Sequence, residues 1–264
     1  VIASMQAAFL FVLNVVTPPF KTYVVIDPPV EGEGLNPLLQ NPLMTIHPPC
    51  LLGGFATFAV PFAFAMAALL ARQTSAEWLK ATRKWTLISW LLLGVGNVLG
   101  GMWAYRELGW GGYWAWDAVE NAALVPWLTA SAYLHSVIIQ EQRGMLKRWN
   151  AVLASLTFLL TLLGTYMTRS GLISSVHTFA ESEVGNYFLA IFAGFTIFAV
   201  AVVASRWKLL EPERNLESAV SRETAFMANN WVLLGMAFVV LWGTLFPKLK
   251  ELATGAKMTI GPPW

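Results

Sequence analysis

Charged residues are scarce in this chain, and the scarcity excludes most soluble folds. Of the 264 residues only 12% are charged, whereas 56% are hydrophobic. A soluble domain carries about a quarter charged residues, so much of this surface must face lipid. A helix needs about 20 apolar residues to cross the hydrocarbon core of a bilayer. We therefore expect an all-α, polytopic helical membrane protein in which residues 1–264 form part of one membrane domain.

Cysteine is nearly absent as well, which excludes disulfide and thiol-relay chemistry within the chain. Cys50 is the one cysteine, so it has no partner for an internal disulfide. The absence of a CxxCH motif excludes a haem attached to this chain through thioether bonds. The net charge is only +2, and the sequence has no basic run, so we expect no nucleic-acid partner.

Seven apolar stretches are read as membrane spans. They lie at about 1–16, 51–71, 86–104, 121–139, 151–167, 187–205 and 231–247. The first stretch has no initiator Met, no charged n-region and no small-residue cleavage site, so it is interpreted as a span and not as a signal peptide. We expect the chain to be part of a longer protein.

The loops between these stretches alternate in basic charge. Loops 72–85, 140–150 and 206–230 hold four, three and four Lys or Arg residues, and the loops that alternate with them hold one each. By the positive-inside rule, the loops poor in Lys and Arg face the non-cytoplasmic side. We expect this outer face to carry loops 17–50, 105–120 and 168–186.

One outer loop is unusually rich in aromatic residues. The stretch "WGGYWAWDAVENAALVPW" places Trp110, Tyr113, Trp114 and Trp116 within seven residues. Interfacial belts need one or two rings per helix end, so this density favours a platform for a flat apolar ligand such as a porphyrin.

Asp117 or Asn121 is suited to cap the helix that follows the aromatic stretch. Arg106 and Arg169 are candidates to meet the propionates of such a ligand, because guanidinium pairs well with carboxylate.

The three histidines occupy two kinds of position. His47 and His177 fall in the predicted outer loops, where each is either a solvated side chain or an axial ligand for iron. His135 falls within the span 121–139, roughly 22 Å along the helix from Glu120. An ionisable group at such a depth is costly, so His135 is either a metal ligand or a histidine hydrogen-bonded between helices.

Three motifs resemble those of a known family. "WGGYWAWDAVENAALVPWL" is similar to the tryptophan-rich WWD signature of haem-handling proteins. It is preceded by "LNPLLQNPLMTIHPP" and followed by "LGTYMTRSGLISSVHTFA". In this order and spacing the three resemble the CcmF-type cytochrome c haem lyase components, including the NrfE relatives, over nearly the whole chain.

The resemblance implies a role for each candidate residue. His47 and His177 would be the axial ligands of an incoming haem, and His135 would bind a resident, non-covalent b-type haem whose second ligand lies beyond residue 264. The haem-docking surface would comprise the signature residues Trp110, Tyr113, Trp114, Trp116, Asp117, Glu120 and Asn121.

The resemblance also implies a setting and partners. The protein would lie in the bacterial inner membrane with its haem-handling face on the periplasmic side. It would receive haem from the chaperone CcmE and act with apocytochrome c and its CcmH-type thiol-handling subunit, so lyase activity would require the full-length protein and these partners. A b-type electron-transfer membrane subunit and a haem transporter are the alternative interpretations.

The orientation is testable by cysteine labelling in the complete parent protein. With Cys50→Ala as background, single cysteines in loop 105–120 should react with a membrane-impermeant thiol reagent added outside intact cells or spheroplasts. Cysteines in loop 72–85 should react only after the membrane is permeabilised. Labelling of loop 105–120 from the cytoplasmic side alone would reverse the orientation.

Overall fold

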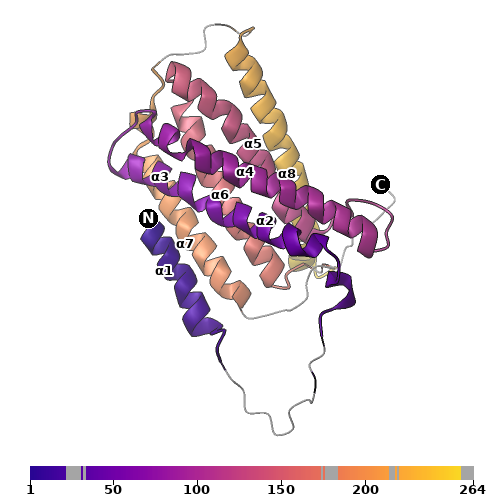
Figure 1. Ribbon diagram of the computed structural model, residues 1–264. Helices are drawn as coiled ribbons and strands as arrows, with labels where there is room; N and C mark the ends of the chain where they lie inside the picture. The colour runs from indigo at the N-terminus through magenta and orange to yellow at the C-terminus, as the bar shows by residue number, and fades with distance from the viewer. Residues whose placement is uncertain are drawn as a thin grey trace.

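A computed structural model describes residues 1–21, 31, 34–173, 175, 184–213, 218 and 220–256. Helices account for the regular structure of these residues, and they pack into a bundle (Figure 1). In chain order they are α1 (Ile2–Phe11), a π-helical turn at Val12–Val16, a short turn at Pro37–Leu39, α2 (Leu43–Thr57), α3 (Ala59–Leu70), α4 (Glu77–Glu107), α5 (Ala118–Arg143), α6 (Lys147–Arg169), α7 (Val184–Ser205), a turn at Trp207–Leu210 and α8 (Arg222–Thr254). The described part of the chain contains no β-strand, so the all-α prediction is confirmed.

Six helical segments are long and apolar enough to cross a membrane. They are Leu43–Leu70, which joins α2 and α3, and the helices α4 to α8. The first predicted span forms a shorter apolar helix, Ile2–Val16, of 15 residues. The polytopic helical architecture is therefore confirmed, with six long helices and one short helix in place of seven full spans.

The predicted loop 17–50 is wrong at its second end, because α2 begins at Leu43 and includes His47. Asn41 explains the early start: its side-chain Oδ1 accepts a hydrogen bond from the backbone N–H of Leu43 at 2.9 Å. Pro42 follows, and proline is well suited to the first turn of a helix. The two prolines Pro48 and Pro49 lie inside the helix, a situation that neighbouring helices tolerate in membrane proteins.

The other two outer loops are also shorter than predicted. Helix α4 continues to Glu107 and α5 begins at Ala118, which leaves 108–117 as the aromatic loop. With 31 residues, α4 is about 46 Å long, so it extends beyond a hydrocarbon core of about 30 Å. Likewise α6 continues to Arg169, and α7 begins at Val184.

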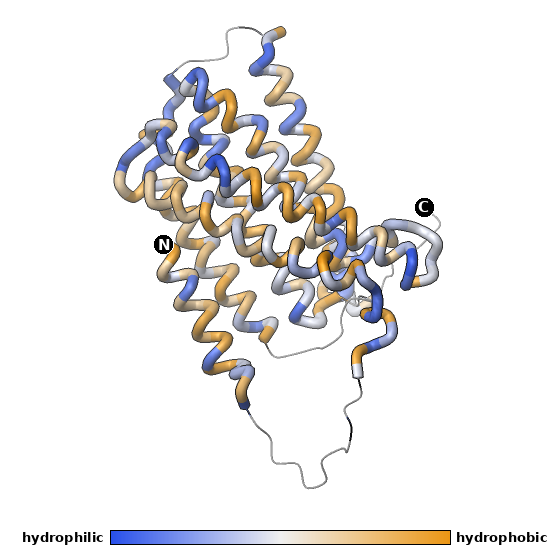
Figure 2. Tube along the Cα trace, in the orientation of Figure 1, coloured by the Kyte–Doolittle hydropathy of each residue, from blue (hydrophilic) through white to orange (hydrophobic). Residues whose placement is uncertain are grey.

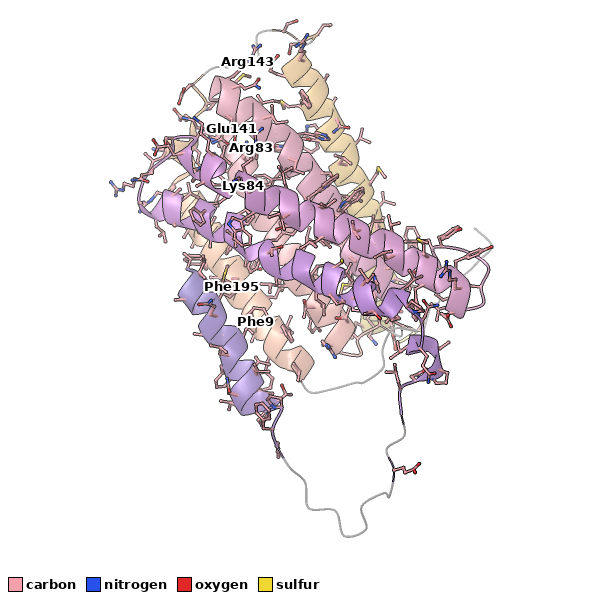
Figure 3. All side chains as sticks on the ribbon, in the orientation of Figure 1. Phe9, Arg83, Lys84, Glu141, Arg143 and Phe195 are labelled. Carbon is pink, nitrogen blue, oxygen red and sulfur yellow. The ribbon has the colours of Figure 1, made fainter. Side chains whose placement is uncertain are left out.

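The two ends of the bundle differ in character. At the end where α4, α6 and α8 begin, ion pairs join Arg83 to Glu141, Arg143 to Glu223, Lys147 to Glu213 and Arg148 to Glu211. We call this the basic end; Figure 3 labels Arg83, Lys84, Glu141 and Arg143 there. The opposite end, which carries the aromatic loop 108–117, is the aromatic end. Hydrophobic residues dominate the helix middles between them (Figure 2).

Aromatic packing joins α3, α6 and α7 in the interior. Phe62 stacks on Phe158 with 4.5 Å between ring centroids, and Phe195 meets both rings edge-on at 6.3 and 5.9 Å. Phe62 is fully buried. Such pairs contribute about 0.5–1.5 kcal/mol each beyond the area they bury.

Glycines allow α2 and α4 to cross at close range. A Cβ atom on Gly54 would lie 2.7 Å from Cγ and 2.8 Å from the backbone nitrogen of Leu93. On the facing helix, a Cβ on Gly96 would lie 2.9 Å from the backbone nitrogen of Leu51. Small residues at such crossings let backbones approach closely, which is how membrane helices gain packing energy in lipid.

This crossing predicts a contrast between two Gly→Ala variants of the parent protein. Gly54→Ala should lower the thermal unfolding midpoint in detergent, because the new methyl group meets the Leu93 backbone, at a cost of about 1–3 kcal/mol. Gly235→Ala in α8 is the matched control, since a Cβ there meets nothing within 4 Å. Removing a helix-interior glycine should leave that variant equally or more stable. Equal midpoints for the two variants would contradict the close crossing.

Candidate functional site

His47 lies on α2 with its ring against α4. Its Nδ1–H donates a hydrogen bond to the backbone carbonyl of Gly96 at 2.7 Å. Because a carbonyl only accepts, the neutral ring must carry its proton on Nδ1, so the lone pair lies on Nε2. A backbone carbonyl on the second nitrogen is a common way to fix the orientation of a metal-binding histidine.

Gly100 provides the space for this ring. A Cβ at Gly100 would lie 2.6 Å from Cε1 of His47, closer than real contacts allow. Gly96 and Gly100 stand four residues apart, so they share one face of α4: one accepts the hydrogen bond, and the other makes room for the imidazole. The spacing is visible in "GNVLGG", and sequence reasoning missed its link to His47.

The segment before His47 is tied to the end of α4. Asn41 donates from Nδ2 to Oε1 of Glu107 at 2.6 Å. The indole Nε1 of Trp103, a fully buried residue, donates to the carbonyl of Leu38 at 2.9 Å. These contacts place the motif "NPLLQNP" beside the aromatic loop.

The aromatic loop is fixed by a capping box at the start of α5. Asp117 is the N-cap, and its Oδ2 accepts from the N–H of Val119 at 2.9 Å. Glu120 reaches back, and its Oε2 accepts from the N–H groups of Ala115 and Asp117 at 3.0 and 3.3 Å. Of the two residues predicted as possible caps, Asp117 is therefore the cap. Asn121 is buried below the loop, where its amide donates to Thr244 of α8 at 2.7 Å.

Three rings of the loop have different surroundings. Trp116 has φ of +58°, an unusual conformation for a bulky residue, and a Cβ on Gly243 of α8 would lie 2.8 Å from its ring. Trp110 donates from Nε1 to the carbonyl of Gly112 at 2.8 Å. Tyr113 stacks on Tyr105 of α4 with 4.7 Å between centroids.

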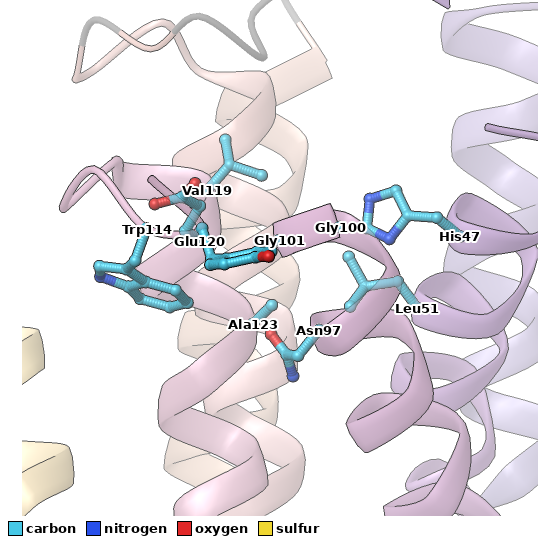
Figure 4. Close-up of a pocket in the computed structure, with 10 residues that line it drawn as sticks. His47, Leu51, Asn97, Gly100, Gly101, Trp114, Val119, Glu120 and Ala123 are labelled. Atoms are coloured by element: carbon cyan, nitrogen blue, oxygen red, sulfur yellow. The ribbon is translucent and has the colours of Figure 1, made fainter. Parts of the chain in front are cut away.

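A pocket joins His47 to the loop (Figure 4). Its space not filled by atoms is about 370 Å³, a figure that includes open solvent. The lining comprises His47, Leu51, Asn97, Gly100, Gly101, Tyr113, Trp114, Val119, Glu120 and Ala123. Of the predicted platform residues, Tyr113, Trp114 and Glu120 thus face a common space with the histidine.

His177 lies outside the described residues, but a neighbouring residue anchors its segment. Ser175, two positions before it, donates from Oγ to Oδ2 of Asp117 at 2.8 Å. The same carboxylate therefore caps α5 and binds the segment after α6. The third motif thus meets the aromatic loop two residues from His177, a contact that sequence reasoning missed.

His135 is at the other side of the membrane domain. It lies on α5, roughly 22 Å along the helix from Glu120, and its Nδ1 is 2.9 Å from Nδ2 of Asn229 on α8. The structure therefore separates His135 from the pocket that contains His47.

The two candidate arginines stand at the aromatic end. Arg106 is in the last turn of α4, and Arg169 ends α6. Both are exposed, and neither forms an ion pair with another described residue. Both guanidinium groups are thus accessible to an anionic group near the loop.

The donor set suits an iron porphyrin better than a bare metal ion. Among the described residues, no group of three or more His, Cys, Asp or Glu side chains could hold a metal. Haem iron has four nitrogen ligands from the porphyrin, and the protein supplies axial ligands such as histidine. His47, with a fixed ring beside aromatic and apolar lining, fits that requirement.

The fold and the site define a polytopic helical membrane protein with a histidine–aromatic site at one end of its bundle. A family model described as cytochrome C assembly protein matches residues 1–174. The cytochrome c-type biogenesis protein CcmF of Pseudomonas aeruginosa is 42% identical over 265 residues, which cover all of this chain and 40% of that protein. CcmF of Escherichia coli K12 is 41% identical, and the match covers all of this chain and 41% of that protein. The probable cytochrome c-type biogenesis protein NrfE of the same strain is 37% identical, and the match covers all of this chain and 48% of that protein.

A solved structure titled cytochrome c heme lyase CcmF matches with a TM-score of 0.74 at 35% identity, over 94% of this chain and 36% of that one. The chain belongs to the cytochrome c assembly protein family and is of the CcmF type. It spans less than half the length of these curated relatives.

The double role of Asp117 yields a test. In the parent protein, Asp117→Ala should increase amide hydrogen exchange in loop 108–117 and in the segment at 170–175, because it removes both the helix cap and the acceptor for Ser175. Loss of the cap alone costs about 1 kcal/mol. Asp117→Asn keeps an oxygen acceptor and should stay close to the parent. Protection in Asp117→Ala equal to that of the parent would contradict the anchoring role.

Proposed function

We propose that this chain is the haem-handling part of a cytochrome c haem lyase component. It binds haem at the aromatic end and takes part in attaching it covalently to the CxxCH cysteines of apocytochrome c. The observation that supports this most is the environment of His47: its ring is fixed by Gly96, has room beside Gly100 and shares a pocket with Tyr113 and Trp114. The names of the relatives point to the same process.

The incoming haem is the substrate of this site. His47 and His177 are its axial ligands; the contact of Ser175, two positions before His177, with Asp117 of the aromatic loop supports this pairing. Tyr113 and Trp114 supply ring surface for the porphyrin. Arg106 and Arg169 are placed to pair with its propionates.

The attachment reaction depends mainly on how the haem and the cysteine thiols are positioned. Each cysteine thiol adds across a haem vinyl group: an S–C and a C–H bond form, while the S–H bond and the C=C π bond are consumed. The addition is redox-neutral, so it needs no oxidant. Holding two reacting groups in the correct geometry lowers the barrier by removing the entropy cost of their encounter. The protein residues therefore act by fixing the haem and not by forming a bond to its vinyl groups.

His135 has a separate task, as a ligand of a resident b-type haem. When bound, such a haem can accept and donate electrons. Its second ligand is expected from residues of the parent protein outside this chain. The position of His135 in a membrane helix and the amide side chain of Asn229 beside its Nδ1 support the assignment.

The aromatic end is proposed to face the periplasm from the bacterial inner membrane; the excess of Lys and Arg in the loops of the opposite end supports this orientation. On that side the chain would meet the haem chaperone CcmE, the apocytochrome and a CcmH-type subunit. The lyase activity is proposed for the full-length protein with these partners.

Histidine variants of the complete parent protein test the proposal. His47→Ala and His177→Ala should each lower holocytochrome c by at least about tenfold, because each removes an axial ligand of the substrate haem. Both should keep the b-type haem spectrum of the membrane fraction, which also shows that they fold. His135→Ala should weaken or remove that spectrum. The measurements are haem-stained holocytochrome c and reduced-minus-oxidised spectra.

A milder variant, which displaces the His47 ring without removing it, tests the assignment of His47 further. Gly100→Ala keeps the imidazole but displaces it, so it should reduce maturation and again spare the b-type spectrum. Normal maturation in all three histidine variants would exclude the proposed lyase function. If His47→Ala loses the b-type haem and His135→Ala keeps it, His47 is the ligand of the resident haem and the two assignments are reversed.

A further inference from the structure

The partner of His135 is a side chain that the sequence does not single out. Asn229 lies on α8, close to its start, and its side chain is exposed. Asparagine is costly in an apolar helix unless it has a polar partner. Its amide meets Nδ1 of His135 at 2.9 Å, across two helices 94 positions apart in the chain. This hydrogen bond ties the imidazole on α5 to α8.

Phe226 supports the same placement. It stands three residues before Asn229, so both lie on one face of α8. Its ring centroid is 5.8 Å from that of His135, with 41° between the planes. Helix α8 thus contacts the imidazole with one polar and one aromatic side chain, while α5 carries the imidazole itself.

The amide can serve either tautomer of the ring. In the orientation observed, Nδ2 of Asn229 donates to Nδ1 of His135, which leaves the ring proton on Nε2. A half-turn of the amide exchanges its nitrogen and oxygen, and the terminal torsion of asparagine permits both positions. Oδ1 then accepts from Nδ1–H, and the lone pair on Nε2 becomes available for iron.

We propose that Asn229 is the positioning residue of His135: it holds the imidazole at Nδ1 and so selects Nε2 as the iron ligand. Ligating histidines generally donate their other N–H to such a partner, which fixes the ring and tunes its basicity. The proposal deepens the proposed function and rests on the assignment of His135 as a haem ligand. It adds a residue from α8, so the geometry of the ligand depends on the packing of two helices.

Two substitutions at Asn229 in the full-length parent protein test this role. Asn229→Leu has a similar volume and no acceptor, so it should lower b-type haem affinity by about 10- to 100-fold. Asn229→Asp keeps an acceptor and adds negative charge, so it should retain the haem and lower its midpoint potential, because a more electron-rich imidazole favours ferric iron. The readouts are haem content per protein, the reduced spectrum and a redox titration.

The controls separate this proposal from the one it rests on. Asn14→Leu makes the same chemical change at an exposed position whose amide donates to the local carbonyl of Leu10, and it should match the parent in haem content and potential. If His135→Ala loses the haem while both Asn229 variants keep parental values, the positioning role is excluded and the ligand assignment stands. If His135→Ala keeps the b-type haem unchanged, both assignments are excluded.

Discussion

The site depends on the close crossing of α2 and α4. Gly54 and Gly96 let the two backbones approach, and this approach brings His47 within hydrogen-bonding distance of a carbonyl on α4. In lipid the hydrophobic effect gives little drive for helix association, so packing at small residues carries much of it. The constraint that holds the two helices together is therefore also the one that fixes the imidazole.

A second set of contacts organises the aromatic loop around one carboxylate. Asp117 caps α5 and accepts from Ser175, and Glu120 closes the loop by accepting from its backbone. Trp116 and Asn121 then connect the same region to α8. Segments from three parts of the chain thus meet at the aromatic end, which explains why a short polar interruption carries so many fixed contacts.

The two described histidines lie at different depths along the helix bundle. The pocket with His47 lies at the aromatic end, and His135 lies toward the basic end with its partner on α8. Each histidine uses Nδ1 for a hydrogen bond, one to a backbone carbonyl and one to a side-chain amide. A carbonyl dictates the tautomer, whereas an amide accommodates both. This difference suits the two proposed roles, a ring fixed for repeated substrate binding and a ring adapted to a resident cofactor.

The sequence by itself determined the helical membrane class, the approximate positions of six spans, two candidate caps for α5 and the motifs that mark the family. It placed the ends of α5, α6 and α7 within four residues. These follow from local properties: hydropathy along a helix and hydrogen bonding at its first turn. It misjudged the start of α2, which lies at Leu43 after Asn41 and Pro42 and not at residue 51. Only the tertiary structure decided which groups the histidines meet. Gly96, Gly100, Ser175 and Asn229 are ordinary residues in the sequence, and their roles arise from contacts between helices that no local pattern records.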